Sequence, residues 1–425
     1  MPLRDRIRAG RSPGDVLAMG PRRDLTVESL DAQAGGPGAD RVVAVQAQDP
    51  LEAIPLLAAL DGAVDTIVLL PDSLSKAETT RLWEAAEAQS ATPPGESSSD
   101  GARSVSTIWA IPTSGTTGTP KLVAHTLESL TRTTRTDLPA FRWGLLYDYA
   151  RFAGLQVTLQ ALLSGGVLLA PDRSQALDRQ IDFLARNGCT HLSGTPTLWR
   201  NILMSPSAGD LPLRQITLGG EIADSAVLSA LRGRYPEARI THIFASTEAG
   251  VGFSVNDGKA GFPKAFLDQP PNPGIRLRVQ EDRLWVLNPS VGHHYIGDNQ
   301  ARVRDAEGWV DTGDSVLVTE DRVHFLGRAS GVINVGGNKV HPEEVERALL
   351  SHPDVLAARV FARSNPFTGA LVAAEIVPAR PDHDVATLKA AVTAHAGSRL
   401  ERHKVPVSVT VVPDLALNAS GKLAR

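Results

Sequence analysis

Short β-branched runs separated by helix-length segments fill the sequence before residue 260, and this alternation constrains the fold more than any other feature. The runs occupy residues 41–45, 66–70, 107–111, 166–170, 215–218 and 239–244. Between two of them, residues 75–88 have the spacing of apolar positions that is typical of a helix. Strands that alternate with helices form parallel sheets joined by crossovers, so the pattern predicts an α/β protein.

The pattern changes after residue 260. Short strands at 274–279, 283–287, 315–318 and 322–326 are separated by Pro, Gly, Asn and Asp, which favours an antiparallel or barrel-like subdomain. Residues 327–331 are expected to form a flexible joint. A helix is then predicted from Pro342 to about Ser351, because proline suits the first helical position and acidic residues follow it. We therefore expect a large domain over residues 1–327 and a small, mobile α+β domain over residues 328–425.

The composition excludes several classes of function. Among 425 residues, 43 are Lys or Arg and 47 are Asp or Glu, so the net charge of −4 argues against nucleic acid or an anionic membrane as the main partner. No apolar run has the length of a membrane span, and the N-terminal residues lack a signal-peptide pattern. Cys189 is the single cysteine, which excludes an internal disulfide and a thiolate zinc cluster and favours a cytoplasmic location. Residues 89–106, rich in Ser, Pro and Gly, are expected to form a surface loop.

The most informative segment follows the strand at 107–111 and concentrates hydroxyl groups, glycines and one ammonium group. It consists of Thr113, Ser114, Gly115, Thr116, Thr117, Gly118, Thr119, Pro120 and Lys121. Hydroxyl groups and exposed backbone N–H groups donate to phosphate oxygens, glycines let the backbone approach an anion, and lysine supplies charge. The spacing is not that of the mononucleotide P-loop, and the dinucleotide fingerprint is absent. The segment therefore predicts a phosphate-binding loop of another kind.

This loop resembles the phosphate-loop signature of the AMP-forming acyl-CoA synthetase and adenylating-enzyme superfamily, which includes luciferases and the adenylation domains of peptide synthetases. Further segments resemble the motifs of that superfamily in the same order, from Thr113 to Arg425. The resemblance implies that ATP and Mg²⁺ serve to activate a small carboxylic acid as an acyl-adenylate. It also implies that the region before the loop is a shortened version of the N-terminal part.

Four motifs supply the implied nucleotide site. Residues 244–248 resemble a Tyr-Gly-x-Thr-Glu motif, in which Phe244 would stack on adenine, Thr247 would touch phosphate and Glu248 would hold magnesium. The intervening Ala245 and Ser246 belong to the same nucleotide-binding segment. Gly219, Gly220 and Glu221 resemble a glycine-rich element that faces adenine and lines the acyl pocket. Asp314 would accept hydrogen bonds from both ribose hydroxyls, and Arg328 would contact ribose and phosphate.

The remaining motifs concern movement and the second substrate. Ser330 is at the expected hinge, Gly336 and Gly337 would border a thiol channel, and Lys422 would approach the carboxylate and the α-phosphate and then swing away. Tyr149 and Arg151 lie in the segment implied to line the acyl pocket. Arg151 would either pair with a second polar group of the acid or point to solvent.

Three functions remain open from the sequence. The first is an acid:CoA ligase that transfers the acyl group to coenzyme A, and the second is an adenylation enzyme that loads the phosphopantetheine of an acyl carrier protein. The third is a non-catalytic nucleotide-binding homologue, which the presence of Glu248, Asp314 and Lys422 disfavours. Neither the identity of the acid nor the oligomeric state is fixed by the sequence.

Overall fold

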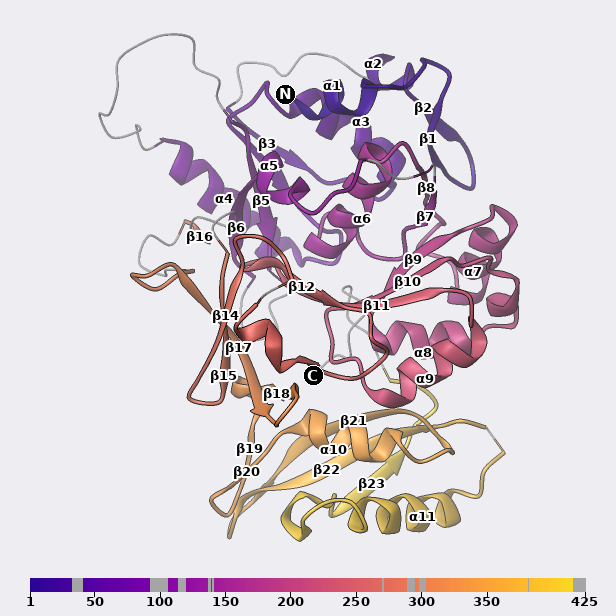
Figure 1. The fold of residues 1–425 in the computed structure, drawn as a ribbon, viewed down its shortest axis with the longest axis vertical. Coiled ribbons are helices and arrows are strands. Elements are labelled where there is room, and N and C mark those ends of the chain that lie inside the picture. The colour runs from indigo at the N-terminus through magenta and orange to yellow at the C-terminus, as the bar shows by residue number, and fades with distance from the viewer. Residues whose placement is uncertain are drawn as a thin grey trace.

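The computed structural model describes residues 1–32, 41–91, 106–113, 120–136, 139, 141–269, 271–288, 295–297, 303–380 and 382–415. Four sheets organise this part of the chain (Figure 1). The first two share a large body, the third lies on one flank of that body, and the fourth lies beneath it. The described part is therefore α/β in its larger portion, with a separate α+β unit at its C-terminal end.

The first sheet has eight strands in the order β12-β11-β10-β9-β7-β8-β1-β2. The strands are β1 (Val16–Met19), β2 (Asp24–Thr26), β7 (Arg142–Gly144), β8 (Val167–Leu169), β9 (His191–Gly194), β10 (Gln215–Gly219), β11 (Arg239–Ser246) and β12 (Gly250–Val255). The six inner strands are parallel and the two edge strands are antiparallel. This arrangement agrees with the parallel sheet expected from the alternating sequence.

The second sheet has five strands in the order β16-β6-β5-β4-β3. Its strands are β3 (Val42–Val45), β4 (Thr66–Leu69), β5 (Ile108–Pro112), β6 (Leu122–Thr126) and β16 (Tyr295–Ile296). Strands β3, β4 and β5 are parallel, whereas β6 runs back against β5 with Pro112 opposite Leu122. Because these two residues flank the hydroxyl-rich segment, that segment is the loop of a hairpin.

The helices of the body pack into different hydrophobic cores. They are α1 (Leu3–Arg8), α2 (Ser29–Ala32), α3 (Pro50–Leu60), α4 (Lys76–Ala91), α5 (Leu127–Thr131), α6 (Phe152–Leu163), α7 (Leu177–Arg186), α8 (Pro196–Met204) and α9 (Ser225–Arg234), with the short 3₁₀ turn η1 (Pro206–Asp210). Helix α6 is buried on nearly all sides and shares one core with α1, α3 and strands of both sheets. Helices α7, α8 and α9 share a second core with the first sheet. Helix α4 extends to Ala91, so the prediction that a loop begins at residue 89 is wrong by three residues.

The third sheet is antiparallel throughout, in the order β13-β18-β17-β15-β14. It consists of β13 (Phe262–Pro263), β14 (Arg276–Gln280), β15 (Arg283–Leu287), β17 (Trp309–Val318) and β18 (Arg322–Arg328), with η2 (Lys264–Leu267) beside it. The expected joint at 327–331 is wrong in its first two residues, because Gly327 and Arg328 pair with Ser315 and Asp314 as the end of β18. Only residues 329–331 leave the sheet, as the 3₁₀ turn η3 (Ala329–Gly331).

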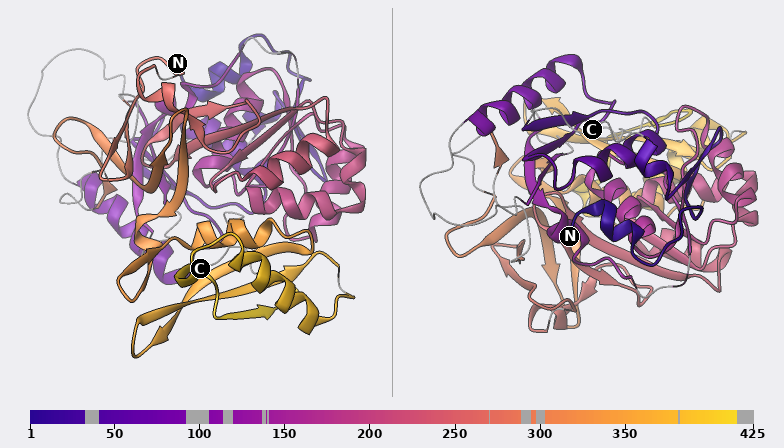
Figure 2. Two further views of the ribbon diagram at one scale, coloured as in Figure 1. Left: turned by 60° about the horizontal axis from the view of Figure 1, so that its bottom comes forward. Right: turned by 90° about the horizontal axis from the view of Figure 1, so that it is seen from above.

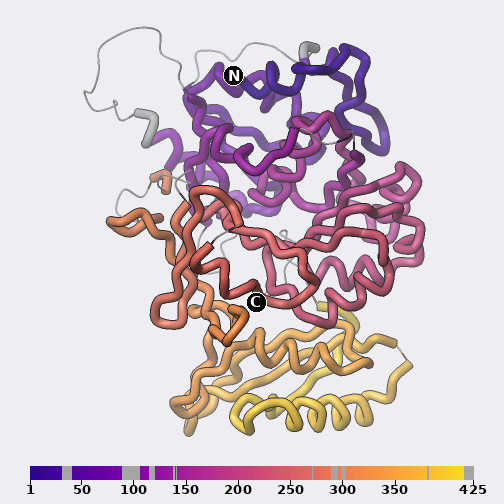
Figure 3. The backbone as a smooth tube through the Cα atoms, in the orientation of Figure 1, coloured from indigo at the N-terminus to yellow at the C-terminus, as the bar shows by residue number. Residues whose placement is uncertain are grey.

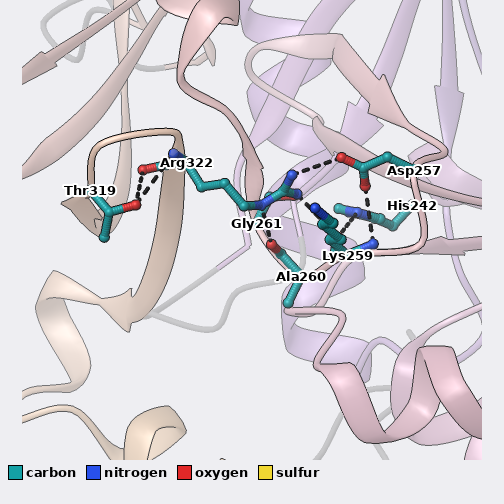
Figure 4. A network of polar contacts seen from close by, with 7 residues as sticks. All are labelled: His242, Asp257, Lys259, Ala260, Gly261, Thr319 and Arg322. Carbon is teal, nitrogen blue, oxygen red and sulfur yellow. Dashed lines mark hydrogen bonds and ion pairs between the residues drawn. The ribbon is translucent and has the colours of Figure 1, made fainter.

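Arg322 fixes the start of β18 to the loop that leaves the first sheet (Figure 4). Its guanidinium donates to the Asp257 carboxylate at 2.7 Å and to the carbonyl oxygens of Ala260, Lys259 and Gly261 at 3.0, 3.3 and 3.1 Å. The side chain is buried, and a planar guanidinium suits such a fan of acceptors. The third sheet is therefore attached to the main body by a charged group whose donors are paired.

The fourth sheet forms the separate unit, which lies to one side of the body in Figures 1 and 2 and at the C-terminal end of the path in Figure 3. Its elements are β19 (Ile333–Val335), β20 (Asn338–Val340), α10 (Pro342–Leu350), β21 (Val355–Asn365), β22 (Gly369–Pro378), α11 (Val385–Gly397), η4 (Arg402–Lys404) and β23 (Ser408–Val411). Both helices pack on the sheet in a core of their own. Helix α10 begins at Pro342 as the sequence predicted. No helix in the described part of the chain combines the length and apolarity needed to cross a bilayer.

Candidate nucleotide and acyl site

The hydroxyl-rich loop is closed at its base by its two described ends. The amide of Thr113 donates to the carbonyl of Lys121 at 2.8 Å, and the amide of Lys121 donates to Thr113 Oγ1 at 3.1 Å. Ser114, Gly115, Thr116, Thr117 and Gly118 lie outside the described residues. The loop joins two antiparallel strands, whereas a mononucleotide P-loop joins a strand to a helix. The predicted phosphate-binding segment thus connects two antiparallel strands and is not followed directly by a helix.

Lys121 and Glu248 both lie near Tyr295, a residue that the sequence analysis did not select. The Lys121 ammonium lies 4.8 Å from the centre of the Tyr295 ring, a distance that favours a cation–π contact. Burial and, second, the negative charge of Glu248 raise the pKa of Tyr295 to about 12. The tyrosine therefore stays protonated at neutral pH, in contact with the loop cation and within the electrostatic influence of the predicted metal carboxylate. Its position on the two-residue strand β16 gave no recognisable signal in the sequence.

The turn that carries Thr247 is anchored by a second residue that the sequence analysis missed. His125, on β6, is buried, and its Nε2 donates to the carbonyl of Thr247 at 2.8 Å. Ser246 Oγ accepts from the amide of Ala249 at 2.9 Å and tightens the same turn. The one signal that the sequence offered for His125 is its position, four residues after Lys121. The strand that follows the phosphate loop thus also fixes the backbone beside Glu248.

Phe244 has aromatic neighbours in the structure. Its ring lies nearly parallel to Phe253 at 5.2 Å and to Phe325 at 5.5 Å between ring centres. A β-bulge follows Phe244, after which Ala245 pairs with Val251 and packs against the main core. Bulges are frequent beside active sites because they redirect a strand end. The stacking of Phe244 on adenine remains a prediction, since its observed partners are protein rings.

The glycine-rich element after β10 has a clear local explanation. Gly220 has a φ of 81°, a left-handed conformation that favours glycine. The carboxylate of Glu221 accepts from the amide of Thr197 at 3.0 Å, at the N-terminus of α8, where a negative charge is favoured. Burial and, second, the charge of Glu221 raise the pKa of Tyr147 above its ordinary value. Gly219 ends β10 next to this turn. A role of these residues toward adenine or the acid remains a prediction.

Asp314 and Arg328 are brought together across β17 and β18. Asp314 Oδ1 lies 3.1 Å from Arg328 Nε, and Arg328 Nη1 donates to the carbonyl of Thr312 at 2.6 Å. The Asp314 side chain is mostly buried, whereas that of Arg328 is 46% exposed. Two motifs that are separated in the sequence thus form a single charged pair at the end of the third sheet, next to the small unit.

The two residues assigned to the acyl pocket have different surroundings. Tyr149 is buried in the main core, and its hydroxyl accepts from the amide of Ala47 at 2.9 Å. Burial raises its pKa to about 12. Arg151 does not point to solvent, because Nη2 donates to Ser73 Oγ at 3.0 Å and Nη1 donates to the carbonyl of Thr113 at 3.4 Å. In this structure Tyr149 is a core residue, and Arg151 lies against the base of the phosphate loop.

The residues assigned to the small unit lie on turns. Gly336 and Gly337, with φ values of 58° and 91°, form the two-residue turn between β19 and β20. Two consecutive positive φ values are what a tight hairpin turn requires, so the hairpin by itself explains both glycines. Ser330 is exposed on η3. Lys422 lies outside the described residues.

A magnesium ion would have Glu248 as its protein carboxylate here. The described residues hold no cluster of three or more His, Cys, Asp or Glu side chains that could bind a metal. A hard cation bound by one carboxylate takes its other oxygens from substrate phosphates and water, as magnesium does with nucleotides. The nearby Lys121 ammonium suits the same polyphosphate. The donor set therefore fits a magnesium ion delivered with a nucleotide.

Comparison with known proteins identifies the chain at the level of its family. Residues 23–314 match the family model of the AMP-binding enzymes, and residues 344–422 match the model of the AMP-binding enzyme C-terminal domain.

Two curated relatives show how far the similarity extends. A dimodular nonribosomal peptide synthase of Bacillus subtilis is 26% identical over 76% of the chain, and a feruloyl-CoA synthase of Amycolatopsis sp is 29% identical over 74% of it. The chain spans 15% of the length of the first and 67% of the second. An o-succinylbenzoate coenzyme A synthetase from Bacillus subtilis, solved with ATP and magnesium, shares the fold, with a TM-score of 0.72 and 20% identity over 99% of this chain and 97% of that one. With a family model matched over more than half of its length, the chain belongs to the AMP-binding enzymes.

Proposed function

We propose that this protein activates a carboxylic acid with ATP and transfers the acyl group to the thiol of coenzyme A. The observation that carries the proposal is the placement of Lys121 and Glu248 near Tyr295, beside the closed base of a hydroxyl-rich loop. Cation and metal carboxylate would then act on the same polyphosphate. Membership of the AMP-binding enzymes and the similarity to a feruloyl-CoA synthase support this reading.

The first step joins two anions, so its barrier is mainly electrostatic. A carboxylate oxygen attacks the α-phosphorus of ATP, the bond from that phosphorus to the bridging oxygen breaks, and pyrophosphate leaves. Lys121 and the loop would offset the charge on the phosphates, and Lys422 would offset charge at the reacting oxygens. Magnesium held at Glu248 would supply further positive charge to the phosphate oxygens when bound. Asp314 would orient the ribose through its hydroxyl groups.

The second step needs a different arrangement at the same site. The sulfur of the thiol attacks the acyl carbon, the thiol proton is lost, and AMP leaves with the electron pair of the broken carbon–oxygen bond. We propose that the small unit after Arg328 rotates about Ser330, so that Lys422 withdraws and Gly336 and Gly337 border the entering thiol. Helix α10 contacts β18 across this boundary, since Arg347 Nη1 donates to the carbonyl of Phe325 at 3.1 Å. A rotation about residues 329–331 would have to break that contact.

One observation favours an acyl acceptor other than coenzyme A. The similarity to a peptide synthase over 76% of the chain supports transfer to the phosphopantetheine arm of a carrier protein. Both acceptors present the same thiol, so the first step is common to them.

We further propose a cytoplasmic location, in line with the single, buried Cys189.

Acid-dependent exchange of labelled pyrophosphate into ATP tests the first step. A broad panel of aromatic, aliphatic and amino acids should contain at least one acid that promotes exchange, and complete inactivity across the panel would refute acid activation. Coenzyme A and a panel of phosphopantetheinylated carrier proteins, offered with the active acid, then distinguish the acceptors. Lys422→Ala should abolish exchange while leaving thioester formation from a supplied acyl-adenylate largely intact. Equal loss of both steps would contradict the proposed rotation.

A further inference from the structure

Arg151 joins the two sheets of the body at the point where the phosphate loop begins. It immediately precedes α6 and follows β7 of the first sheet. Both of its hydrogen-bond partners lie in segments that leave strands of the second sheet: Ser73 comes after β4, and Thr113 comes directly after β5. Ligands of open α/β folds bind beyond the carboxyl ends of parallel strands. The Arg151 guanidinium thus connects the segments after the carboxyl ends of β4 and β5, at the start of the predicted phosphate loop.

The partners of Arg151 determine which backbone group it holds. Nη1 donates to the carbonyl of Thr113, whose amide and hydroxyl in turn close the loop onto Lys121. Nη2 donates to Ser73 Oγ, which fixes the plane of the guanidinium. The Nε atom is buried and has no hydrogen-bond partner among the described residues. A shift of Arg151 would therefore be transmitted to the first residue of the loop.

A neighbouring arginine, Arg173, shares the charged surroundings of Arg151. Asp148 is buried, and its carboxylate accepts from the amide of Ala150 at 2.9 Å and lies 3.5 Å from Nη1 of Arg173. Arg173 follows β8, and its ion pair in the described part of the chain is with Asp148 rather than with Thr113 or Lys121. Arg151 and Arg173 thus share one charged cluster, but only Arg151 has hydrogen bonds to the phosphate-loop base and to Ser73. This difference makes Arg173 a matched control.

We propose that Arg151 is a positioning residue for ATP: it holds the N-terminal end of the phosphate loop at the spacing that the polyphosphate needs. It therefore determines the affinity for ATP rather than the affinity for the acid. This inference rests on the proposed function, because it assumes that the loop binds the phosphates of ATP. It replaces the two roles expected from the sequence, a partner for the acid and a solvated side chain.

Arg151→Met tests the proposal, because methionine keeps an apolar stem while removing both donors. Equilibrium binding of ATP with magnesium, measured by calorimetry without any acid, should weaken by about 10-fold, the order expected for losing hydrogen bonds from a charged donor. Arg151→Lys should recover part of this loss, because one ammonium reaches only one of the two acceptors. In pyrophosphate exchange the KM for ATP should rise with the KM for the acid unchanged. Arg173→Met should leave the affinity for ATP within twofold of the wild type.

Thermal unfolding of each variant separates loss of folding from loss of positioning. If Arg151→Met does not fold, Arg151→Lys and Ser73→Ala carry the comparison, each expected to weaken ATP binding by a few-fold. The inference is overturned if the folded Arg151 variants bind ATP as the wild type does, if only the KM for the acid changes, or if Arg173→Met has an equal effect. Failure of the proposed function looks different: the wild type itself would then bind no ATP or support no exchange.

Discussion

Asp314 and Arg328 face one another across β17 and β18, with Oδ1 of the aspartate 3.1 Å from Nε of the arginine. The arginine also holds the carbonyl of Thr312. Arg328 is therefore oriented by the strand that carries Asp314, at the last residue before the chain leaves the third sheet. Arg328 therefore links Asp314, the residue predicted to bind ribose, to the start of the small unit.

Asp314→Asn should weaken ATP use by about 10-fold or more, because an amide offers one acceptor oxygen where the carboxylate offers two charged ones. Comparing ATP with 2′-deoxy-ATP in pyrophosphate exchange tests the cause. The wild type should discriminate against the deoxynucleotide, and the variant should lose most of that discrimination. Asp311→Asn, three residues away and paired with Arg283, is the control and should keep it. Unchanged discrimination in Asp314→Asn would remove the ribose role.

Glu248→Gln should reduce pyrophosphate exchange by at least about 100-fold and raise the magnesium concentration needed for half-maximal rate. A neutral amide is a poor ligand for a hard cation. The substitution also removes the negative charge that offsets the positive charge of the Lys121 ammonium. A magnesium titration at saturating ATP measures the effect. Glu237→Gln, an exposed residue on the surface, serves as the control. An unaltered magnesium requirement in Glu248→Gln would assign the metal to another group.

Tyr149→Phe should destabilise the protein by about 1 kcal/mol and leave the KM for the acid unchanged. The hydroxyl is engaged with the amide of Ala47 inside the core, and losing one such hydrogen bond has roughly this cost. Denaturant unfolding and exchange kinetics measure the two quantities. Tyr235→Phe loses a similar bond, to the carbonyl of Ala208, and should match it in stability. A selective rise in the KM for the acid would return Tyr149 to the acyl pocket.

Because of His191, the free energy of unfolding should decrease as the pH falls from 6.5 to 4. Burial and, second, the positive charge of Arg214 lower its pKa to about 4, and its ring stacks on Phe141 at 4.0 Å between centres. The folded state thus favours the neutral ring. The resulting stability is complete above the unfolded pKa near 6.5 and is lost as the pH falls through the folded pKa, by up to about 3 kcal/mol. His191→Phe should flatten the dependence of unfolding free energy on pH in this window, and an unchanged slope would contradict the assignment.

Arg322→Met should destabilise the protein by about 3 kcal/mol, because it leaves the carboxylate of Asp257 and buried carbonyl oxygens without their donor. The network of Figure 4 attaches the third sheet to the body, so the loss should appear as earlier unfolding of residues 309–328 in hydrogen exchange. Arg179→Met, at an exposed position of α7, is the control. Uniform protection of the third sheet in Arg322→Met would show that the network does not carry the attachment.

Those strands and helices that have a clear local pattern were predictable from the sequence. The runs at 41–45, 66–70 and 215–218 are strands in the structure, and Pro342 begins α10. The boundary error at Gly327 and Arg328 occurs because pairing with residues of β17 extends β18. The local preference of residues for strand or loop does not reveal such pairing partners, since the partners lie in another segment of the chain.

The family could be read from the sequence because several short motifs resemble those of the adenylating enzymes and occur in the same order. The residues that meet those motifs from elsewhere in the chain came only from the folded molecule: Tyr295 beside Lys121, His125 on the carbonyl of Thr247, and Arg151 on the carbonyl of Thr113. These contacts depend on how the strands of two sheets are ordered and where their ends meet. Strand order is set by packing over the whole body, and no short stretch of sequence contains it.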